Sequence, residues 1–216
     1  MVFSLQPPFL FVHIDKAAGS SIAVALQPLA TRRKKSLWRR RLTWLGGLNR
    51  LGLYRSLEFS AHAHAREAQR CLPPAVYESL FKFAFVRNPW DRLVSRYAYL
   101  LKNEKHPRHG FVKRMKDFDE YIAWEFRRGK FFQYTYVTDS AGKLIVDFIG
   151  HYERLPEDFA KVCTRLGMNV ELPRYNASSH RDYRTYYTPA TRELVGKYFA
   201  RDIEMFGYDF DGLRKK

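Results

Sequence analysis

Two short runs of apolar residues constrain the fold most, because each is followed directly by a turn and the start of an amphipathic helix. The runs are FLFVHI at Phe9–Ile14 and FKFAFV at Phe81–Val86. Near-continuous apolar runs of this length are typical of strands buried on both faces, as in a parallel sheet covered by helices. We therefore expect an α/β fold with a central mainly parallel sheet flanked by helices, and ligands at the carboxyl ends of the strands.

Further strands and helices are predicted along the rest of the chain. Leu144–Ile149 is predicted as a strand and Phe118–Phe126 as a helix. Asn88 and Pro89 suit the cap and the first position of a helix that runs to Leu101. Other predicted helices cover Ser20–Leu29, a segment that ends near Cys71 before Pro73 and Pro74, Pro156–Leu166 ended by Gly167, and a last segment from Thr188–Pro189 to near Gly207.

The length and charge of the chain limit its organisation and its partners. With 216 residues, 46% of them hydrophobic, it suits a single domain over residues 1–216. Its net charge of +16 attracts anions such as nucleotides, polyanionic glycans, nucleic acid or an acidic membrane face. Residues 31–57, which include the run Arg32–Arg41, are expected to form a basic and mobile insertion. That run would hold an anionic acceptor, rest on anionic lipid, or be a solvated stretch of charge.

Neither a metal site nor a membrane span is predicted. Cys71 and Cys163 are the only cysteines and have no CxxC partners, which disfavours a zinc site and suits buried thiols in a reducing compartment. The N-terminal stretch lacks the pattern of a signal peptide, and no run approaches ~18 apolar residues. We expect a cytoplasmic protein, with peripheral contact to the inner membrane left open. No nucleic-acid partner is expected, because zinc-finger and RNP signatures are missing.

The first strand-to-helix junction carries the sequence HIDKAAGSS at His13–Ser21. Its small residues let the backbone approach an anion, and the N–H groups and positive dipole end at a helix start favour negative charge. A lysine and two serines add a mobile cation and hydroxyl donors. The GxxxxGK[ST] pattern of a Walker A loop is absent, which disfavours a kinase or ATPase. The candidate anion ligands are Lys16, Ala18, Gly19, Ser20 and Ser21.

The second junction carries the sequence FVRNPWDRLVSRY at Phe85–Tyr97. Arg87 ends the strand, and Ser95 lies two helical turns later, on the face that points back toward the strand end. The guanidinium fork of Arg87 would grip a phosphate while the Ser95 hydroxyl donates a further hydrogen bond. The alternative is a basic amphipathic helix with a solvated arginine.

The two motifs together resemble those of carbohydrate sulfotransferases of the Golgi type (sulfotransferase family 2) and their bacterial relatives, which use 3′-phosphoadenosine 5′-phosphosulfate (PAPS). The resemblance covers Phe9 to about Phe210, and Asp15 replaces the proline usual in the first motif. It implies a P-loop-like three-layer fold and sulfuryl transfer from PAPS to a hydroxyl of a carbohydrate, such as an anionic glycan or glycolipid, without a metal. It also implies that Lys16, Gly19, Ser20 and Ser21 take the 5′-phosphosulfate, and Arg87 and Ser95 the 3′-phosphate.

A pair of histidines, His62 and His64, lies between the two motifs. Histidine titrates near neutrality and suits a general base that accepts the proton of an attacking hydroxyl. A similar pair precedes the 3′-phosphate motif in heparan and uronyl 2-O-sulfotransferases, which implies His64 as the base of an in-line displacement and His62 as its assistant. The alternatives are Glu58 or Asp15 as the base, or two ordinary histidines that open a helix. His13 lies on the buried strand and is predicted to be structural.

A polar, basic loop follows late in the chain, at Ser178–Arg184. Members of the family often cover the nucleotide with a loop at this point, which makes Arg181 and Arg184 candidate nucleotide ligands. The neighbouring tyrosines are predicted to pack on the final helix. Three rival functions stay open: a nucleotide-dependent kinase with a degenerate phosphate loop, a basic nucleic-acid- or membrane-binding module, and a membrane-associated scaffold that binds nucleotide without turnover.

Overall fold

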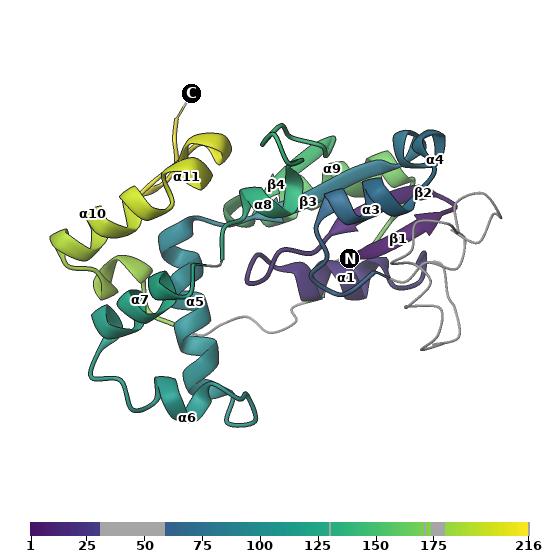
Figure 1. The fold of residues 1–216 in the computed structure, drawn as a ribbon. Coiled ribbons are helices and arrows are strands. Elements are labelled where there is room, and N and C mark those ends of the chain that lie inside the picture. The colour runs from purple at the N-terminus through teal and green to yellow at the C-terminus, as the bar shows by residue number, and fades with distance from the viewer. Residues whose placement is uncertain (31–58, 130, 171, 174–179, 216) are drawn as a thin grey trace. The chain divides into compact units, whose positions relative to one another are not determined.

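A computed structural model describes residues 1–30, 59–129, 131–170, 172–173 and 180–215 of the chain (Figure 1). The chain divides into two compact units. The first unit consists of Met1–Phe85 and Thr135–Tyr175, and the second unit of Val86–Tyr134 and Asn176–Lys216. A single functional domain over residues 1–216 stays a prediction. The expected basic insertion over residues 31–57 lies outside the described residues.

The first unit is built on a four-stranded sheet with the order β1-β2-β3-β4. Its strands are β1 (Val2–Leu5), β2 (Pro8–Val12), β3 (Phe81–Val86) and β4 (Phe148–His151). β1 and β2 pair antiparallel, whereas β2 and β3 pair parallel, with Phe9 opposite Phe81. Along β3, the Lys82 carbonyl accepts from the Asp147 N–H and the Phe85 ring lies against Gly150, so β4 follows the direction of β3.

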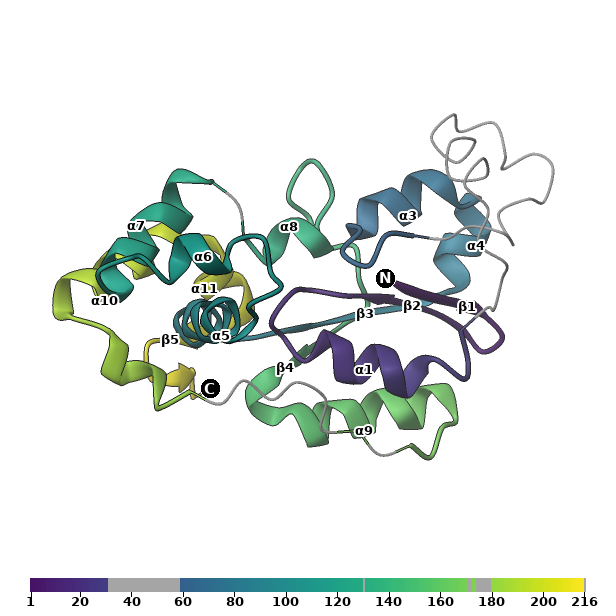
Figure 2. The same ribbon diagram turned by 90° about the horizontal axis from the view of Figure 1, so that it is seen from below.

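Helices cover both faces of this sheet (Figure 2). α1 (Gly19–Leu26) and α9 (Leu155–Leu166) lie on one face, and α3 (Ala65–Cys71) and α4 (Pro74–Ser79) on the other. The face under α1 and α9 is a phenylalanine core, because alternate strand residues point to it. Its strand members are Phe9, Phe11, Phe83 and Phe85. The three-layer α/β fold expected from the sequence is confirmed in this unit.

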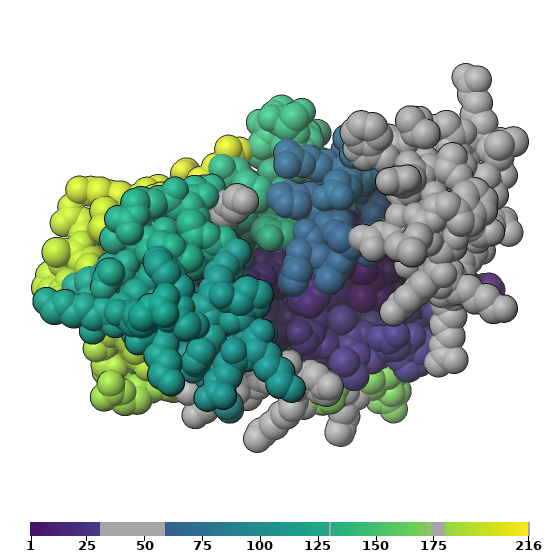
Figure 3. Space-filling model, turned by 60° about the horizontal axis from the view of Figure 1, so that its bottom comes forward, coloured from purple at the N-terminus to yellow at the C-terminus, as the bar shows by residue number. Residues whose placement is uncertain are grey.

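The segment from Phe59 to α3 runs along the start of the chain. The Phe59 ring meets the Phe3 ring edge to face at 6.1 Å. In Figure 3 the blue segment after residue 59 borders the purple N-terminal segment on the surface of the first unit. This contact brings the histidines that precede α3 to the amino-terminal strands.

The second unit is mostly helical and has an aromatic core. Its core residues include Trp90, Tyr121 and Phe199, all buried. Its elements are α5 (Pro89–Lys102), α6 (His109–Val112), α7 (Phe118–Arg127), a 3-10 helix (Tyr183–Tyr186), α10 (Pro189–Tyr198), α11 (Ala200–Phe206), β5 (Tyr208–Asp209) and β6 (Gly212–Leu213). Two short elements complete the described chain: α8 (Tyr134–Val137) and a 3-10 helix (Tyr152–Arg154).

Several expected element boundaries shift for identifiable reasons. The strand predicted at Leu144–Ile149 begins later as β4, because Leu144 and Ile145 pair instead with Thr138 and Val137. The last helix is interrupted at Phe199, whose buried ring packs into the aromatic core between α10 and α11. Pro74 opens α4 at its first position, although the sequence suggested only the end of a helix there.

Among the described residues, no helix is both long enough and apolar enough to span a bilayer.

Candidate functional site

The loop between β2 and α1 has the backbone shape of an anion site. Lys16 and Ala18 both take left-handed backbone conformations, with φ of 66° and 59°. Each residue other than glycine that adopts this conformation costs about 1 kcal/mol of backbone energy. Turns of this kind direct successive N–H groups inward to form anion-binding nests. Ala18 at the cap position has no side-chain oxygen to cap α1, and the first turn of α1 carries no acidic residue. The loop therefore favours an external anion at the start of α1.

Gly19 and His13 form a tight contact beneath this loop. A Cβ atom added at Gly19 would lie 1.8 Å from Cδ2 of His13, so no larger residue fits while the histidine keeps its place. The pKa of His13 is lowered to about 4, mainly by burial and in addition by the neighbouring His62, against an opposing effect of Asp15. His13 is therefore neutral at pH 7 and fills space against Gly19.

The remaining motif residues differ in burial. Ser21 is buried, Ser20 is exposed, and Lys16 is partly exposed. Ser20 and Lys16 are therefore the more accessible members of this loop.

His62 lies beside His13 on the surface of the first unit. Their ring centroids are 4.7 Å apart, and Nδ1 of His62 lies 3.2 Å from the carbonyl oxygen of His13. Because a carbonyl only accepts, Nδ1 carries the proton and Nε2 keeps its lone pair.

His64 is held by a different set of partners. Its Nδ1 donates to the carbonyl of Thr135 at 2.7 Å, and its ring stacks on Tyr136 with centroids 4.4 Å apart. Its backbone N–H donates to Oε1 of Glu67 at 2.9 Å, which anchors the residue at the start of α3. The Nδ1–H tautomer leaves Nε2 as an acceptor on a fixed, half-buried ring, which is the state that a general base needs.

In the second unit, the Arg87 side chain is buried and oriented by ion pairing. Its Nε donates to Oδ2 of Asp91, in the first turn of α5, at 2.7 Å. Its Nη2 lies 3.2 Å from Nε2 of His180, whose Nδ1 contacts the carbonyl of Arg181. Nε2 of His180 therefore accepts from Arg87, and the guanidinium is held on two sides.

The backbone at Arg87 is fixed by one side-chain amide. Gln133 accepts from the Arg87 N–H at 2.9 Å and donates to the Arg87 carbonyl at 2.8 Å. The Gln133 N–H in turn donates to Asp202, a buried carboxyl whose pKa is raised by burial. Ser95 is fully buried on α5, four residues after Asp91 and on the same helix face. Arg87, Asp91 and Ser95 thus form one prearranged row along α5.

The late loop places its two arginines differently. Arg184 pairs with Asp182 and Asp211 and lies over the ring of Tyr183. Arg181 is exposed, with its guanidinium 5.9 Å from the centre of the Tyr186 ring. The tyrosines pack into the aromatic core, as the sequence suggested. A nucleotide-covering role for either arginine stays a prediction.

The sequence did not reveal three partners of Arg87, which are Asp91, Gln133 and His180. Asp91 had a signal, because it lies four residues after Arg87 where helical side chains meet. Gln133 and His180 lie 46 and 93 residues from Arg87, and no local pattern indicates them.

The fold and these two clusters define an α/β protein that presents basic and hydroxyl groups at strand-to-helix junctions, in the manner of proteins that bind phosphorylated ligands. The model of the sulfotransferase family matches residues 1–209, and the chain belongs to that family. The predicted family and enzyme class, a sulfotransferase, are thereby confirmed.

Two further similarities accompany the family match. An uncharacterized protein of Archaeoglobus fulgidus is 37% identical over 110 residues, which is 50% of this chain and 87% of that protein. The crystal structure of the mouse sulfotransferase SULT7A1 complexed with PAP matches 93% of this chain and 85% of its own, with a TM-score of 0.54 and 14% identity. The structural match supports the fold class alone.

Proposed function

We propose that this chain transfers a sulfuryl group from PAPS to a hydroxyl of a carbohydrate acceptor. The observation that carries the donor assignment is Arg87, a buried residue directly after β3 whose guanidinium is held by Asp91 and His180. A buried and oriented arginine of this kind suits recognition of a phosphate, because its rigid fork offers paired donors. Membership of the sulfotransferase family, and the PAP held by the mouse sulfotransferase, support PAPS as the donor.

The donor is held through both of its charged ends in this proposal. Arg87 and Ser95 take the 3′-phosphate, while Lys16 and the backbone N–H groups of Ala18 and Gly19 take the 5′-phosphosulfate. Ser20 and Ser21 add hydroxyl donors at the same end, and Arg181 and Arg184 cover the nucleotide. The left-handed turn at Lys16 and Ala18 supports the phosphosulfate assignment, because backbone strain of this kind clusters at ligand sites.

The transfer is an in-line displacement. The acceptor oxygen forms a bond to sulfur while the bond from sulfur to the bridging phosphate oxygen breaks, and PAP leaves. Nε2 of His64 takes the acceptor proton, since Nδ1 already donates to Thr135. Lys16 and the loop N–H groups stabilise the charge on the leaving phosphate, and a preorganised donor of this kind lowers a barrier by ~3–4 kcal/mol.

His62 acts as an assistant to His64 in this scheme. A carbohydrate is the favoured acceptor, because the two motifs resemble those of carbohydrate sulfotransferases. Within the described part of the chain, no group of three or more histidine, cysteine or acidic side chains is placed to hold a metal ion. The positive charge in the proposed chemistry comes from Lys16 and the backbone.

Calorimetric titration of PAP, of ADP and of ATP with magnesium tests the donor site. We expect tight binding of PAP without a metal, and at least tenfold weaker binding of ADP, which lacks the 3′-phosphate. Arg87→Ala should bring the affinity for PAP down to that for ADP. Tight, magnesium-dependent binding of ATP would favour the kinase, and binding of no nucleotide would refute the donor assignment.

A further inference from the structure

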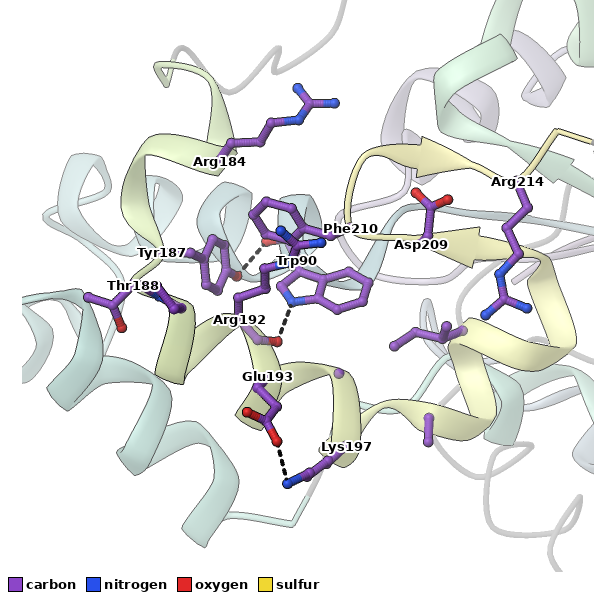
Figure 4. Close-up of a pocket in the computed structure, with 14 residues that line it drawn as sticks. Trp90, Arg184, Tyr187, Thr188, Arg192, Glu193, Lys197, Asp209, Phe210 and Arg214 are labelled. Carbon is purple, nitrogen blue, oxygen red and sulfur yellow. Dashed lines mark hydrogen bonds and ion pairs between the residues drawn. The ribbon is translucent and has the colours of Figure 1, made fainter.

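A pocket lies on the second unit between α10, α11 and the β5–β6 hairpin (Figure 4). Its volume of about 740 Å³ falls in the range of small-molecule sites, ~300–1,000 Å³. None of the residues to which the proposed transfer assigns chemistry lines it, except Arg184 at its edge. Its 14 lining residues all belong to the second unit.

The floor of the pocket consists of three aromatic rings set at right angles. Trp90 and Phe210 meet edge to face with centroids 5.6 Å apart, and Tyr187 meets Phe210 in the same way at 5.7 Å. The polar atoms of two rings are used internally: Nε1 of Trp90 donates to the carbonyl of Arg192, and the Tyr187 hydroxyl donates to the carbonyl of Trp90. The floor is therefore rigid and without unsatisfied polar groups, although Trp90 and Phe210 are only 5% and 9% exposed and little of their ring surface reaches the pocket.

The rim of the pocket carries more positive than negative charge. Its cations are Arg184, Arg192, Lys197 and Arg214, and its carboxylates are Glu193 and Asp209. Glu193 forms an ion pair with Lys197, with Oε1 and Nζ 2.6 Å apart. Arg184 forms ion pairs with two aspartates outside the pocket. Oδ1 of Asp209 accepts from two backbone N–H groups of the hairpin.

Two guanidinium groups thus remain at the rim without a carboxylate. Across the described ranges, neither Arg192 nor Arg214 makes an ion pair. Arg192 is nonetheless held in place, because its guanidinium lies 4.1 Å from the centre of the Phe210 ring. In Figure 4, Arg192 lies over the aromatic floor and Arg214 reaches the pocket from the side of β6. A ligand that carries an anionic group beside an apolar part suits this arrangement.

We propose that this pocket binds one anionic sugar ring, a uronate or a sulfated residue of a glycan. Arg192 holds the carboxylate or sulfate, Arg214 adds a second positive charge on the other side of Trp90, and the apolar face of the sugar lies against the apolar lining of the pocket. The inference that a sugar binds here depends only on the features of the pocket. Its use as a holding site for the acceptor glycan or its sulfated product rests on the proposed function.

The first experiment measures binding of a defined, short ligand, because long polyanions bind any surface with a charge of +16. A glucuronate-containing disaccharide and its sulfated counterpart are titrated by calorimetry at 0.15 M salt, beside the neutral glucose disaccharide. We expect the two anionic sugars to bind and the neutral one to bind at least tenfold more weakly.

Two charge variants and a matched control locate the site. Arg192→Gln and Arg214→Gln should each weaken binding of the anionic disaccharides about tenfold, the value of one charge-assisted contact. Arg165→Gln is the control, because Arg165 is also an exposed helix arginine over a phenylalanine ring, here Phe81 of the first unit. Equal losses in all three variants would mean attraction by surface charge and would overturn the site.

A shape variant tests the pocket without removing charge. Ala200 is exposed at the first position of α11 and lines the pocket, so Ala200→Tyr should obstruct it while the core is left intact. Loss of sugar binding with an unchanged thermal midpoint supports the proposal. Unchanged sugar binding in this variant would overturn it.

Titration of PAP on the same variants separates this inference from the proposed function. PAP binding that survives in Arg192→Gln and Ala200→Tyr, together with lost sugar binding, supports a site separate from the donor site. Sugar binding without any PAP binding would refute the proposed function, whereas the inference that the pocket binds an anionic sugar would remain supported. Displacement of the sugar by PAP would assign the pocket to the nucleotide and overturn the inference.

Discussion

Arg87, which directly follows β3, and Asp91 in the first turn of α5 form a buried ion pair, with Nε and Oδ2 2.7 Å apart and side chains only 5% and 12% exposed. Asp91 sets the direction of the guanidinium and reduces its net charge when no ligand is bound. A phosphate bound at Arg87 would add a second anion to the same guanidinium. Stability and ligand binding are therefore linked at this pair.

Asp91→Asn should destabilise the ligand-free protein and increase its stabilisation by PAP. Removing one partner of a fully buried ion pair costs ~3–5 kcal/mol, and the partial exposure of Asp91 reduces the expected loss to about 2 kcal/mol. The bound phosphate then replaces the missing counter-charge, so saturating PAP should raise the thermal midpoint more in the variant than in the wild type. Glu193→Gln is the control, since it breaks the exposed pair with Lys197 and should change stability by less than about 0.5 kcal/mol. An Asp91→Asn protein as stable as the wild type would contradict this prediction.

Lys16→Asn should lower kcat about 10²–10³-fold without unfolding the protein. Asparagine tolerates the left-handed conformation that Lys16 adopts, so the loop is retained while its cation is lost. The loss corresponds to one preorganised donor on the leaving phosphate. Sulfate transfer and thermal midpoint are measured together, and Lys16→Arg should keep part of the activity. A kcat near the wild-type value in Lys16→Asn would exclude Lys16 from the transfer step.

Local patterns predicted the parts of the fold that depend on neighbouring residues. Asn88 caps α5 through Trp90, Thr188 caps α10 through Thr191, and Gly167 ends α9 in a left-handed conformation, as expected. Each of these is a contact within a few residues, and the residue type alone indicates it. The boundaries of β2, β3 and α5 were predictable for the same reason.

The parts that escaped prediction depend on distant partners. β1 was missed because its short stretch gains its place only by pairing with β2. The start of β4 moved because residues 144–145 pair with residues near 137. Gln133 and His180 reach Arg87 only through the tertiary fold. The sequence motifs therefore located the candidate ligands, whereas the groups that orient them required the structure.

His64→Asn should lower kcat about 10²-fold or more and leave PAP affinity unchanged. The Nδ2 amide group of asparagine can still donate to the Thr135 carbonyl, so the position is kept while the acceptor nitrogen Nε2 is lost. His62→Asn serves as the comparison and should have a smaller effect, because its ring is exposed and contacts only His13 among the interactions described above. Steady-state kinetics and PAP titration distinguish the two roles. A larger loss in His62→Asn would reverse the assignment of base and assistant.

Gly19→Ala should cost about 1–3 kcal/mol of unfolding free energy, because its Cβ would overlap the His13 ring. His13→Ala removes that ring, so the double variant should lose less stability than the sum of the two single variants. Urea denaturation of all four proteins measures this coupling. Gly110→Ala is the matched control, since its Cβ would meet nothing within 4 Å. Additive losses would show that the contact with His13 is not the reason for glycine at position 19.

The stability of the protein should fall between pH 6.5 and pH 4 in a manner that depends on His13. Its pKa is lowered from 6.5 to about 4, with burial as the main cause, so within this range the unfolded state binds a proton that the folded state does not. Stability therefore rises with pH through this window and is constant above it as far as His13 is concerned. At pH 5 the expected loss is about 2 kcal/mol relative to pH 7. Unfolding free energies of the wild type and His13→Asn are compared at both pH values. The contribution of the carboxylates to the pH dependence is common to both proteins and cancels in this comparison. Between pH 7 and pH 5, the unfolding free energy of the wild type should fall by about this amount more than that of His13→Asn. An equal fall in both proteins would mean that His13 titrates normally in the folded state.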